Sequence, residues 1–396
     1  MTHRQMTRLE LKNTALLAAI FACRMLGLFM VLPVLGLYLD VIPGATPFTL
    51  GLAAGIYGFT QAVCQLPFGA LSDKLGRKPI IFVGLLIFIL GSLIAAFSHS
   101  IGGLIIGRAI QGAGAIGAPV LAFIADLTRT SVRTRAMAGI GVSIGCTFMV
   151  AFLVGPRLEA ALGLHSLFVI TAALGVMGIG LLYCVTPEAV LVKPHPNAKS
   201  GGIYTLVRNS PYLVRLNINI FVLHAVLTAC FLVIPHQIQN IAGLVTGDSW
   251  QYYLPVLLLS VLCIAPWLRK TENISVQIKH MKAAWLAIGC GIISLFSATG
   301  VGFLFGGGIL FFAAFNLLES ILPALISRVA PLHSKGLAMG LYSCSQFLGM
   351  FVGGLLGGSL WQFFGPWGVG GGCLLLTIWA WLTLMNQRSN EQWLEA

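Results

Sequence analysis

Charged residues are scarce in this sequence. Only 9% of its 396 residues are Asp, Glu, Lys or Arg, whereas about a quarter are charged in soluble domains. The sequence also lacks the Gly-Lys-Ser/Thr loop that cradles ATP phosphates, and its nine cysteines follow no metal-ligand spacing. These absences argue against a water-soluble fold, ATP hydrolysis and a metal site. No paired catalytic groups stand out, so we expect neither an enzyme nor a bound cofactor.

Long apolar runs are what the sequence has in abundance. Hydrophobic residues make up 58% of the chain, and a helix needs about 20 of them to cross the hydrocarbon core of a bilayer. The runs do not alternate polar and apolar residues, which a membrane β-barrel would require. We therefore predict an all-α membrane protein with twelve transmembrane helices. The spans begin near Thr14, Thr49, Pro79, Ile101, Ala136, His165, Leu213, Gln251, Ala283, Gly302, Gly336 and Phe364.

The basic residues have a regular placement that gives the topology. The net charge is +12, and the Lys and Arg residues outside the spans lie before the first span and after the even-numbered spans, with Arg157, near the end of the fifth, as the exception. Because basic loops stay on the cytoplasmic side, we predict that both termini are cytoplasmic and that the number of spans is even. The positive charge is then a topology signal, and no nucleic-acid partner is expected.

The chain divides into two parts of similar design. A polar stretch over 188–211, rich in Pro and Gly, predicts a cytoplasmic linker between an N-terminal half, 1–187, and a C-terminal half, 212–396. A basic residue followed by small residues and Met occurs at 134–139 and again at 334–340. Internal repeats are typical of transporters, whose substrate site lies between the repeats near the membrane midplane. We expect two pseudo-symmetric halves of six helices each.

The stretch from Gly69 to Lys78 combines residues with complementary needs. Asp73 ends a helix, where the helix dipole disfavours an anion, so it needs a cation or another helix's N-terminus. Gly76 permits a tight turn, and Arg77 can bridge carboxylates. We predict a conformational latch in which Asp73 meets the span that begins near Gly336 and Arg77 reaches Asp126. The alternative is a merely basic loop. The latch residues are Gly69, Asp73, Gly76, Arg77, Lys78 and Asp126.

This stretch resembles the loop motif Gly-x-x-x-Asp-x-x-Gly-Arg-Lys of the major facilitator superfamily and matches every defined position. Residues 107–112 are similar to the Arg-x-x-Gln-Gly element of its drug/proton antiporter branch, and residues 24–34, 315–319 and 342–349 also resemble bacterial members. The resemblance implies the major facilitator fold, the inner membrane of a bacterium, alternating access and proton-driven efflux. We expect a monomer in the lipid bilayer that handles a small-molecule substrate and protons.

One departure from the branch concerns the fifth span. Gly155 and Pro156 are present and predict a helix bend, but Arg157 and Glu159 follow where the branch has further glycines. This departure weakens the antiporter interpretation and leaves the fold prediction intact. A proton-coupled importer or a facilitator of a small metabolite on the same fold stays open as the alternative.

Polar and ionisable residues inside the spans are candidates for proton coupling or for lining a polar cavity. Glu319 is the first candidate, because apolar surroundings favour the neutral form of an acid, as a proton carrier requires. Its alternative is a static partner for an arginine, and His224 has the alternative of a hydrogen-bonded structural residue. The abundant aromatic residues favour an amphipathic or lipophilic substrate. The full candidate set is Arg24, Arg108, Gln111, His224, Asn316, Glu319 and Gln346.

Overall fold

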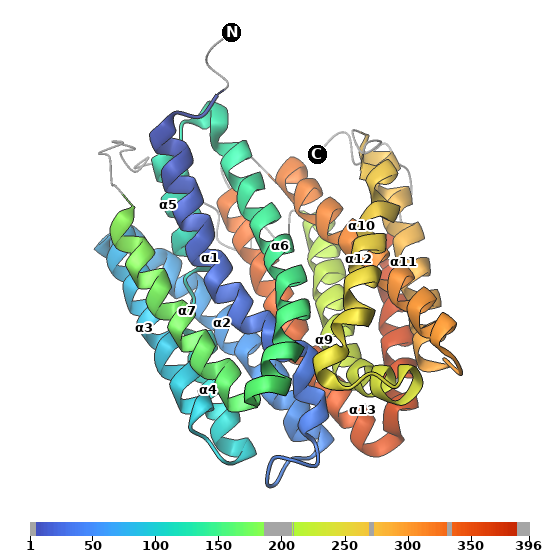
Figure 1. Ribbon diagram of the computed structural model, residues 1–396. Helices are drawn as coiled ribbons and strands as arrows, with labels where there is room; N and C mark the ends of the chain where they lie inside the picture. Colours follow the sequence, from blue (N-terminus) through green and yellow to red (C-terminus); the bar gives the residue numbers. More distant parts are fainter. Residues whose placement is uncertain (1–4, 186–207, 209, 269–272, 331–334, 386–396) are drawn as a thin grey trace.

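The computed structural model describes residues 5–185, 208, 210–268, 273–330 and 335–385, and within them it forms helices and no strands (Figure 1). The all-α prediction is confirmed. The predicted linker falls almost wholly outside the described residues. The N-terminal half contains α1 (Arg8–Leu35), α2 (Pro47–Leu75), α3 (Arg77–Ala96), α4 (Ile101–Ala113), α5 (Gly117–Leu127), α6 (Thr130–Leu162) and α7 (Leu164–Cys184). The C-terminal half contains α9 (Pro211–Ala242), α10 (Trp250–Leu268), α11 (Ile274–Phe296), α12 (Val301–Val329) and α13 (Lys335–Met385).

Two features reconcile these helices with twelve spans. The 51 residues of α13 would extend ~76 Å as one straight helix, far beyond the bilayer. Gly365, at φ 68° and ψ −168°, breaks α13 into two spans ahead of Pro366. Conversely, α4 and α5 form one interrupted span, Ile101–Leu127. The interruption was not predicted; it lies where Gly112 and Gly114 press against the carbonyl oxygens of Tyr57 and Gly84.

Ten helical stretches of the described chain are long and apolar enough to cross a membrane, with α13 counted once and α2 not included.

Several helices begin earlier than their apolar runs. Helix α1 begins at Arg8 rather than near Thr14, because Thr7 and Glu10 form a capping box in which each side chain accepts the other's backbone N–H. Helix α11 begins at Ile274, after the cap Asn273, rather than near Ala283. Caps extend these helices beyond the stretch that hydropathy marks.

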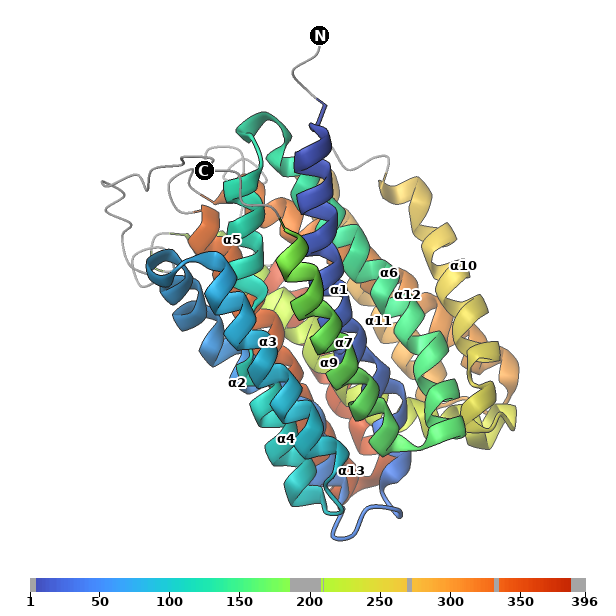
Figure 2. The same cartoon turned by 60° about the vertical axis from the view of Figure 1, so that its left-hand side comes forward.

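The bundle has two chemically different ends. We call the end where α1 begins and where the basic residues of the α2–α3 and α5–α6 connections lie the basic end; it is uppermost in Figures 1 and 2. The other is the opposite end. Twelve spans bring the end of α13 back to the basic end. The alternation of basic residues in the sequence therefore corresponds to one face of the bundle.

Helix α13 holds the two halves together through small residues. Gly353 and Gly357 press against Ala225 and Ala229 of α9, as the small-xxx-small spacing predicts. Gly354 packs on the other side, where a methyl group added to it would lie 2.3 Å from the carbonyl oxygen of Gly51 in α2. The backbones of three spans therefore touch, and α13 is packed against both halves.

Candidate functional site

The loop motif forms a compact polar cluster at the basic end. The Arg77 Nη1 lies 2.5 Å from the Asp73 Oδ1, and its Nε donates to the Asp126 Oδ2 at 2.8 Å. Nη1 also donates to the Ser72 hydroxyl at 2.6 Å, and Ser72 in turn donates to the carbonyl of Gly69 at 2.7 Å. The contact between Arg77 and Asp126 is the one the sequence predicts.

The pairing resolves two unfavourable placements. Helix α3 begins at Arg77 rather than at Pro79, so this cation sits at a helix N-terminus while Asp73 sits at a C-terminus. The helix dipoles disfavour both charges, and each becomes the partner of the other. Gly76 makes the turn between the helices possible, because its φ of 96° lies in the left-handed region. Lys78 donates to the carbonyl of Val185 at the end of α7.

Contact between α2 and α13 is close around Gly55 and Gly58 and looser near the basic end. Added methyl groups at Gly55 and Gly58 would lie 2.7 and 2.4 Å from the backbone oxygens of Phe351 and Phe347. Farther along, Cys344 Sγ lies 3.5 Å from the carbonyl oxygen of Ala62. At Gly340 the nearest atom is the side chain of Leu66, 3.6 Å from an added methyl. The two halves therefore diverge toward the basic end.

The predicted contact between Asp73 and α13 belongs to this loosened region. The Asp73 side chain is 63% exposed, and a methyl group added to Gly336 would meet no atom of the described residues within 4 Å. The nearest neighbour of Gly69 is Ala118 Cβ of α5, in its own half. In this conformation Asp73 pairs with Arg77, and its contact with α13 stays a prediction for a state in which the basic end is closed.

In the C-terminal half, three of the predicted residues meet near the middle of their helices. The Glu319 Oε1 of α12 lies 3.3 Å from the His224 Nε2 of α9. The Gln346 Nε2 of α13 lies 2.9 Å from the same His224 nitrogen, and His224 Nδ1 is 3.3 Å from the carbonyl oxygen of Ile220. We call Glu319, His224 and Gln346 the acidic centre.

Glu319 is placed where a proton could reach it. Its side chain is 30% exposed, although Oε1 is buried and accepts no hydrogen bond from the described residues. The described ion-pair partner is a histidine, and both the proton-carrier role and the alternative of a static partner for an arginine stay predictions. Asn316, one turn before Glu319 on α12, donates instead to Ser260 of α10 at 3.1 Å and stands apart from this centre.

The N-terminal half has a centre of opposite charge. Arg24 of α1 is fully buried and donates to the Gln61 Oε1, and the Gln61 amide donates to Gln65 at 2.8 Å. Arg108 of α4 is 2% exposed and donates to Gln111 at 2.7 Å and to the carbonyl of Ala53 at 3.3 Å. These predicted residues therefore lie inside the half rather than on an accessible surface.

Tyr57 of α2 joins the two arginines, and sequence reasoning missed it. The guanidinium carbons of Arg24 and Arg108 lie 5.4 and 5.0 Å from its ring centroid, within cation–π range. They are thus no more than about 10 Å apart, where two like charges repel by roughly 2 kcal/mol at an effective dielectric constant of about 20. Among the described residues neither arginine forms an ion pair. We call Arg24, Tyr57 and Arg108 the cationic centre.

A buried group of aromatic rings joins the halves between these centres and the opposite end. The Phe152 ring of α6 lies 4.9 Å from that of Phe231 in α9 and 5.3 Å from that of Tyr253 in α10. Phe148 of α6 reaches Phe312 and Phe315 of α12, each at 6.2 Å, and Phe315 lies 5.8 Å from the His224 ring. These rings close the interface toward the opposite end.

The fifth span provides further contacts at the opposite end. Gly155 lies against the backbone of Met30 in α1, and α6 continues as one helix through Pro156, so the predicted bend stays a prediction. The Arg157 guanidinium lies 4.6 Å from the Trp250 ring of α10 and so connects the halves. The residue that breaks the regular charge placement therefore has a packing role.

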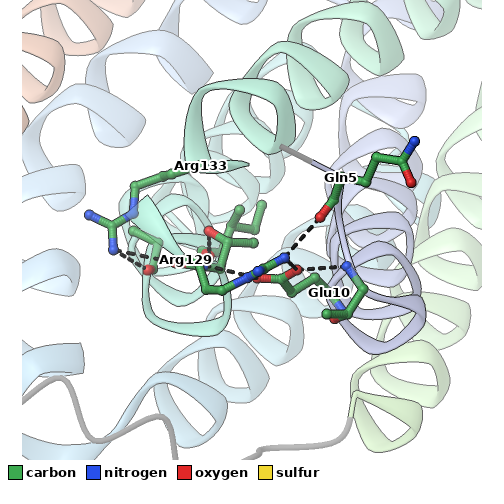
Figure 3. Close-up of polar contacts among 8 residues, drawn as sticks. Gln5, Glu10, Arg129 and Arg133 are labelled. Atoms are coloured by element: carbon green, nitrogen blue, oxygen red, sulfur yellow. Dashed lines mark hydrogen bonds and ion pairs between the residues drawn. The ribbon is translucent and has the colours of Figure 1, made fainter. Parts of the chain in front are cut away.

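An ion pair that sequence reasoning missed ties α1 to α6 at the basic end. Figure 3 shows Arg129, just before α6, reaching the carboxylate of Glu10 with Nε at 2.9 Å and Nη2 at 3.0 Å. The Arg129 Nη2 also donates to the carbonyl of Gln5 at 2.8 Å. The Glu10 carboxylate raises the pKa of Arg129. Separation in sequence hides such a pair from inspection of local motifs.

Comparisons with known proteins agree with this geometry. The model of the Major Facilitator Superfamily matches residues 17–318. Inner membrane transport protein YajR of Escherichia coli (strain K12) is 44% identical over 384 residues, which are 95% of this chain and 83% of YajR. Quinolone resistance protein NorA of Staphylococcus aureus (strain MSSA476) is 23% identical over 85% of this chain and 87% of NorA. The human organic anion transporter MFSD10 (TETRAN) has a similar structure, with a TM-score of 0.72 at 18% identity, covering 95% of this chain and 99% of MFSD10.

Proposed function

The chain belongs to the major facilitator superfamily, and we propose that it exports a small amphipathic or lipophilic compound by proton-coupled alternating access. Its family makes it a multi-pass membrane transporter of small molecules rather than an enzyme, and transporters of this family need no cofactor. Export and proton coupling are the proposed part. The name of NorA, a quinolone resistance protein, supports export.

The observation that carries the proposal is the acidic centre. Apart from Glu319, the acidic residues of the described chain lie near helix ends or in the segments between helices. Glu319 combines a partly exposed side chain with a buried oxygen, Oε1, that accepts no hydrogen bond from the described residues and lies 3.3 Å from a histidine nitrogen. An intramembrane acid in such surroundings is a proton-pathway residue by default. We infer that Glu319 takes up and releases the coupled proton and that His224 and Gln346 orient its carboxyl group.

The material between the halves supports an amphipathic or lipophilic substrate. The rings of Phe148, Phe312 and Phe315 adjoin the acidic centre, and aromatic faces bind apolar and amphipathic compounds well. A compound bound between the halves would thus meet rings on one side and polar groups on the other. This position also lies where internal repeats place substrate sites.

Orientation follows from the basic end. If that end faces the cytoplasm, as the positive-inside rule predicts, both termini are cytoplasmic and the divergence of α2 from α13 opens the protein inward. We propose this orientation in a bacterial inner membrane, with YajR, an inner membrane transport protein by name, as support. We also propose that the transporter works as a monomer, because one chain contains both halves.

The latch residues would control the return to the outward-facing state. Closing the basic end would extend the α2–α13 contacts past Leu66 and Gly340, bring α13 toward Gly69, and carry Asp73 to the N-terminus of α13. An anion is stabilised there. Arg77 would stay paired with Asp126 and hold the loop to its own half. Each contact would contribute on the order of 1 kcal/mol, enough to shift a two-state equilibrium several-fold yet weak enough to release in each cycle.

Transport in proteoliposomes tests the proposal. The purified chain would be assayed with a panel of a quinolone, ethidium, tetraphenylphosphonium and benzoate, with and without an imposed pH gradient, and with empty liposomes as the control. We expect at least one amphipathic compound to accumulate against its gradient only when the pH gradient is present. Equal transport with and without the gradient would favour a facilitator, and accumulation in the direction that corresponds to uptake into the cell would favour an importer.

A further inference from the structure

The cationic centre contains buried donors that no described residue satisfies. Nε and Nη1 of Arg24 and the hydroxyl of Tyr57 are all buried and have no hydrogen-bond partner in the described chain. Arg24 and Tyr57 are each 0% exposed, so bulk water does not satisfy these groups either. A buried polar group without a partner is costly, and a native structure rarely keeps three together without a reason.

The unbalanced positive charge of the cationic centre is independent evidence that it binds a ligand. Arg24 and Arg108 place two guanidinium groups around one tyrosine ring, and no carboxylate of the described chain pairs with either. The face of the ring offsets part of this charge. A buried ionised group normally keeps a counter-ion, and intramembrane arginines normally pair with acids or carbonyls. Arg108 reaches the carbonyl of Ala53, but neither arginine has a carboxylate counter-ion in the described chain, so the two together point to a negative ligand.

The neighbouring residues exclude a cation as the ligand. The acceptor oxygens of Gln61 and Gln111 are each already engaged by one arginine. The groups left over are two donors on the planar guanidinium of Arg24 and the hydroxyl of Tyr57, which can also donate. A guanidinium presents its N–H groups in a fork that matches a carboxylate. The recognition chemistry is thus that of an anionic acceptor.

We propose that Arg24, Tyr57 and Arg108 form a binding site for an anionic group, either the carboxylate of the transported compound or a free chloride-sized anion. The first source makes the substrate class amphipathic carboxylates. This assignment rests on the proposed transport function, whereas the binding itself does not depend on proton coupling.

Access to the site is linked to the transport cycle. The Phe347 ring of α13 lies 6.5 Å from the Tyr57 ring and covers the centre, while its neighbour Gln346 contacts His224 of the acidic centre. An anion therefore exchanges when α13 separates from α2 at the level of Tyr57. The same movement displaces Gln346, so ligand exchange at one centre disturbs the other.

Thermal unfolding of the full purified chain in detergent tests the proposal without any gradient. The probes are sodium benzoate, sodium chloride and the neutral benzamide, each titrated at fixed pH and at constant ionic strength. A ligand that binds the native state raises the midpoint in proportion to the logarithm of its concentration. We expect benzoate to raise the midpoint clearly more than benzamide does.

Variants assign the binding to this site. Arg24→Gln and Arg108→Gln should weaken benzoate binding by about ten-fold or more, since each removes a charged partner. Tyr57→Phe keeps the ring and should weaken it by about three- to ten-fold. Arg8→Gln, at an exposed position of the same helix α1, removes equal charge and should leave binding unchanged. If the Gln variants do not fold, Arg24→Lys and Arg108→Lys keep the charge, lose the fork and should still weaken binding.

The outcomes separate the two sources of the anion. Stabilisation by benzoate without chloride assigns the site to the carboxylate of an organic substrate. Stabilisation by both assigns it to a small anion. Stabilisation by chloride alone likewise assigns it to a small anion. Equal effects of benzoate and benzamide on the wild-type chain, together with no effect of chloride, overturn the proposal, as does a benzoate effect that all of the site variants retain. None of these results depends on whether transport is coupled to protons.

Discussion

The two halves share a six-helix design but carry opposite chemistry at their centres. The N-terminal half buries Arg24 and Arg108 around Tyr57, with exposures of 0–2%. The C-terminal half places Glu319 beside His224 with a side chain that is 30% exposed. The first centre is closed and offers donors; the second is partly open and offers an acceptor that can be protonated. The two halves therefore share a helical scaffold, and their buried polar side chains give each half a different chemical role.

Helix α13 is the element through which these centres can influence one another. Its Phe347 meets Tyr57 of the N-terminal half, and the adjacent Gln346 meets His224 of the C-terminal half. Consecutive side chains on a helix point in different directions, which lets one span contact both. Variants in the two halves therefore test which centre couples transport to protons and which centre binds the substrate.

The largest expected effect comes from Glu319→Gln, which keeps the shape of the side chain and removes its charge. If the acidic centre alone carries the proton, accumulation driven by a pH gradient should fall to the level of empty liposomes. Exchange of substrate for substrate should continue, since it needs no net proton movement. Both rates are measured with radiolabelled substrate in proteoliposomes.

The matched control is Asp248→Asn, which removes an acid from an exposed position of the same half. It should leave both rates unchanged. If gradient-driven accumulation survives in the Glu319 variant, another residue carries the coupled proton, and the proposed difference between the two centres is wrong.

The next effect concerns the contact that joins the halves. In Gly354→Ala the new methyl group would lie 2.3 Å from the carbonyl oxygen of Gly51, so α13 and α2 must separate. We expect a loss of about 1–3 kcal/mol in unfolding free energy, measured by thermal or denaturant unfolding.

Gly306→Ala is the control, because a methyl group there meets nothing within 4 Å. Alanine is favoured over glycine inside a helix by roughly 0.5–1 kcal/mol, so this variant should be neutral or slightly stabilised. If both variants lose the same stability, the close backbone contact between the halves is not what α13 contributes.

A several-fold effect is expected from the latch, which only the N-terminal half contains. Asp73→Asn removes the anion that the N-terminus of α13 would stabilise when the basic end is closed, so it should favour the conformation that is open at the basic end, by about 1 kcal/mol. The readout is the labelling rate of a Gly340→Cys variant in a background whose native cysteines are replaced. Labelling should rise and transport should fall.

Lys279→Gln provides the comparison across halves, because Lys279 is an exposed basic residue near the start of α11, after the corresponding loop. It should change neither labelling nor transport. An equal response to Asp73→Asn and Lys279→Gln would mean that Asp73 has no role of its own in closing the basic end.

The smallest effect is expected at the opposite end, where a substitution should lower the labelling at Gly340→Cys rather than raise it. Arg157→Ala removes the cation–π contact with Trp250 at the opposite end, worth about 0.5–1 kcal/mol. That end should then open more readily, and labelling at Gly340→Cys should fall. A rise in labelling would show that the Arg157–Trp250 contact does not hold the opposite end closed.

Much of the fold could be predicted because a bilayer restricts the options. Apolar run lengths and the alternation of basic residues give the number of spans, and local spacing predicts the glycine contacts of α13. The break between α4 and α5 could not be predicted, since it depends on how Gly112 and Gly114 meet other helices. Helix starts were placed late for a similar reason, because the capping of α1 by Thr7 and Glu10 lies outside the apolar run.

In the candidate site, too, some contacts could be predicted from the sequence and others could not. The contact between Arg77 and Asp126 follows from charge and helix ends, so the sequence predicts it. Tyr57 carries no charge and belongs to no motif, so only the arrangement of α1, α2 and α4 brings it between two arginines. Glu319 was predicted as an intramembrane acid, but its partner His224 is far away in sequence and emerges only from packing.

The most direct test of proton coupling reverses the direction in which energy flows. Proteoliposomes with a trapped pH-sensitive dye would receive a gradient of the best-transported panel compound and no pH gradient. The account predicts that movement of the compound changes the internal pH in the wild-type chain and in Asp248→Asn, and that Glu319→Gln abolishes the change. Movement of the compound through the wild-type chain at constant internal pH would contradict it.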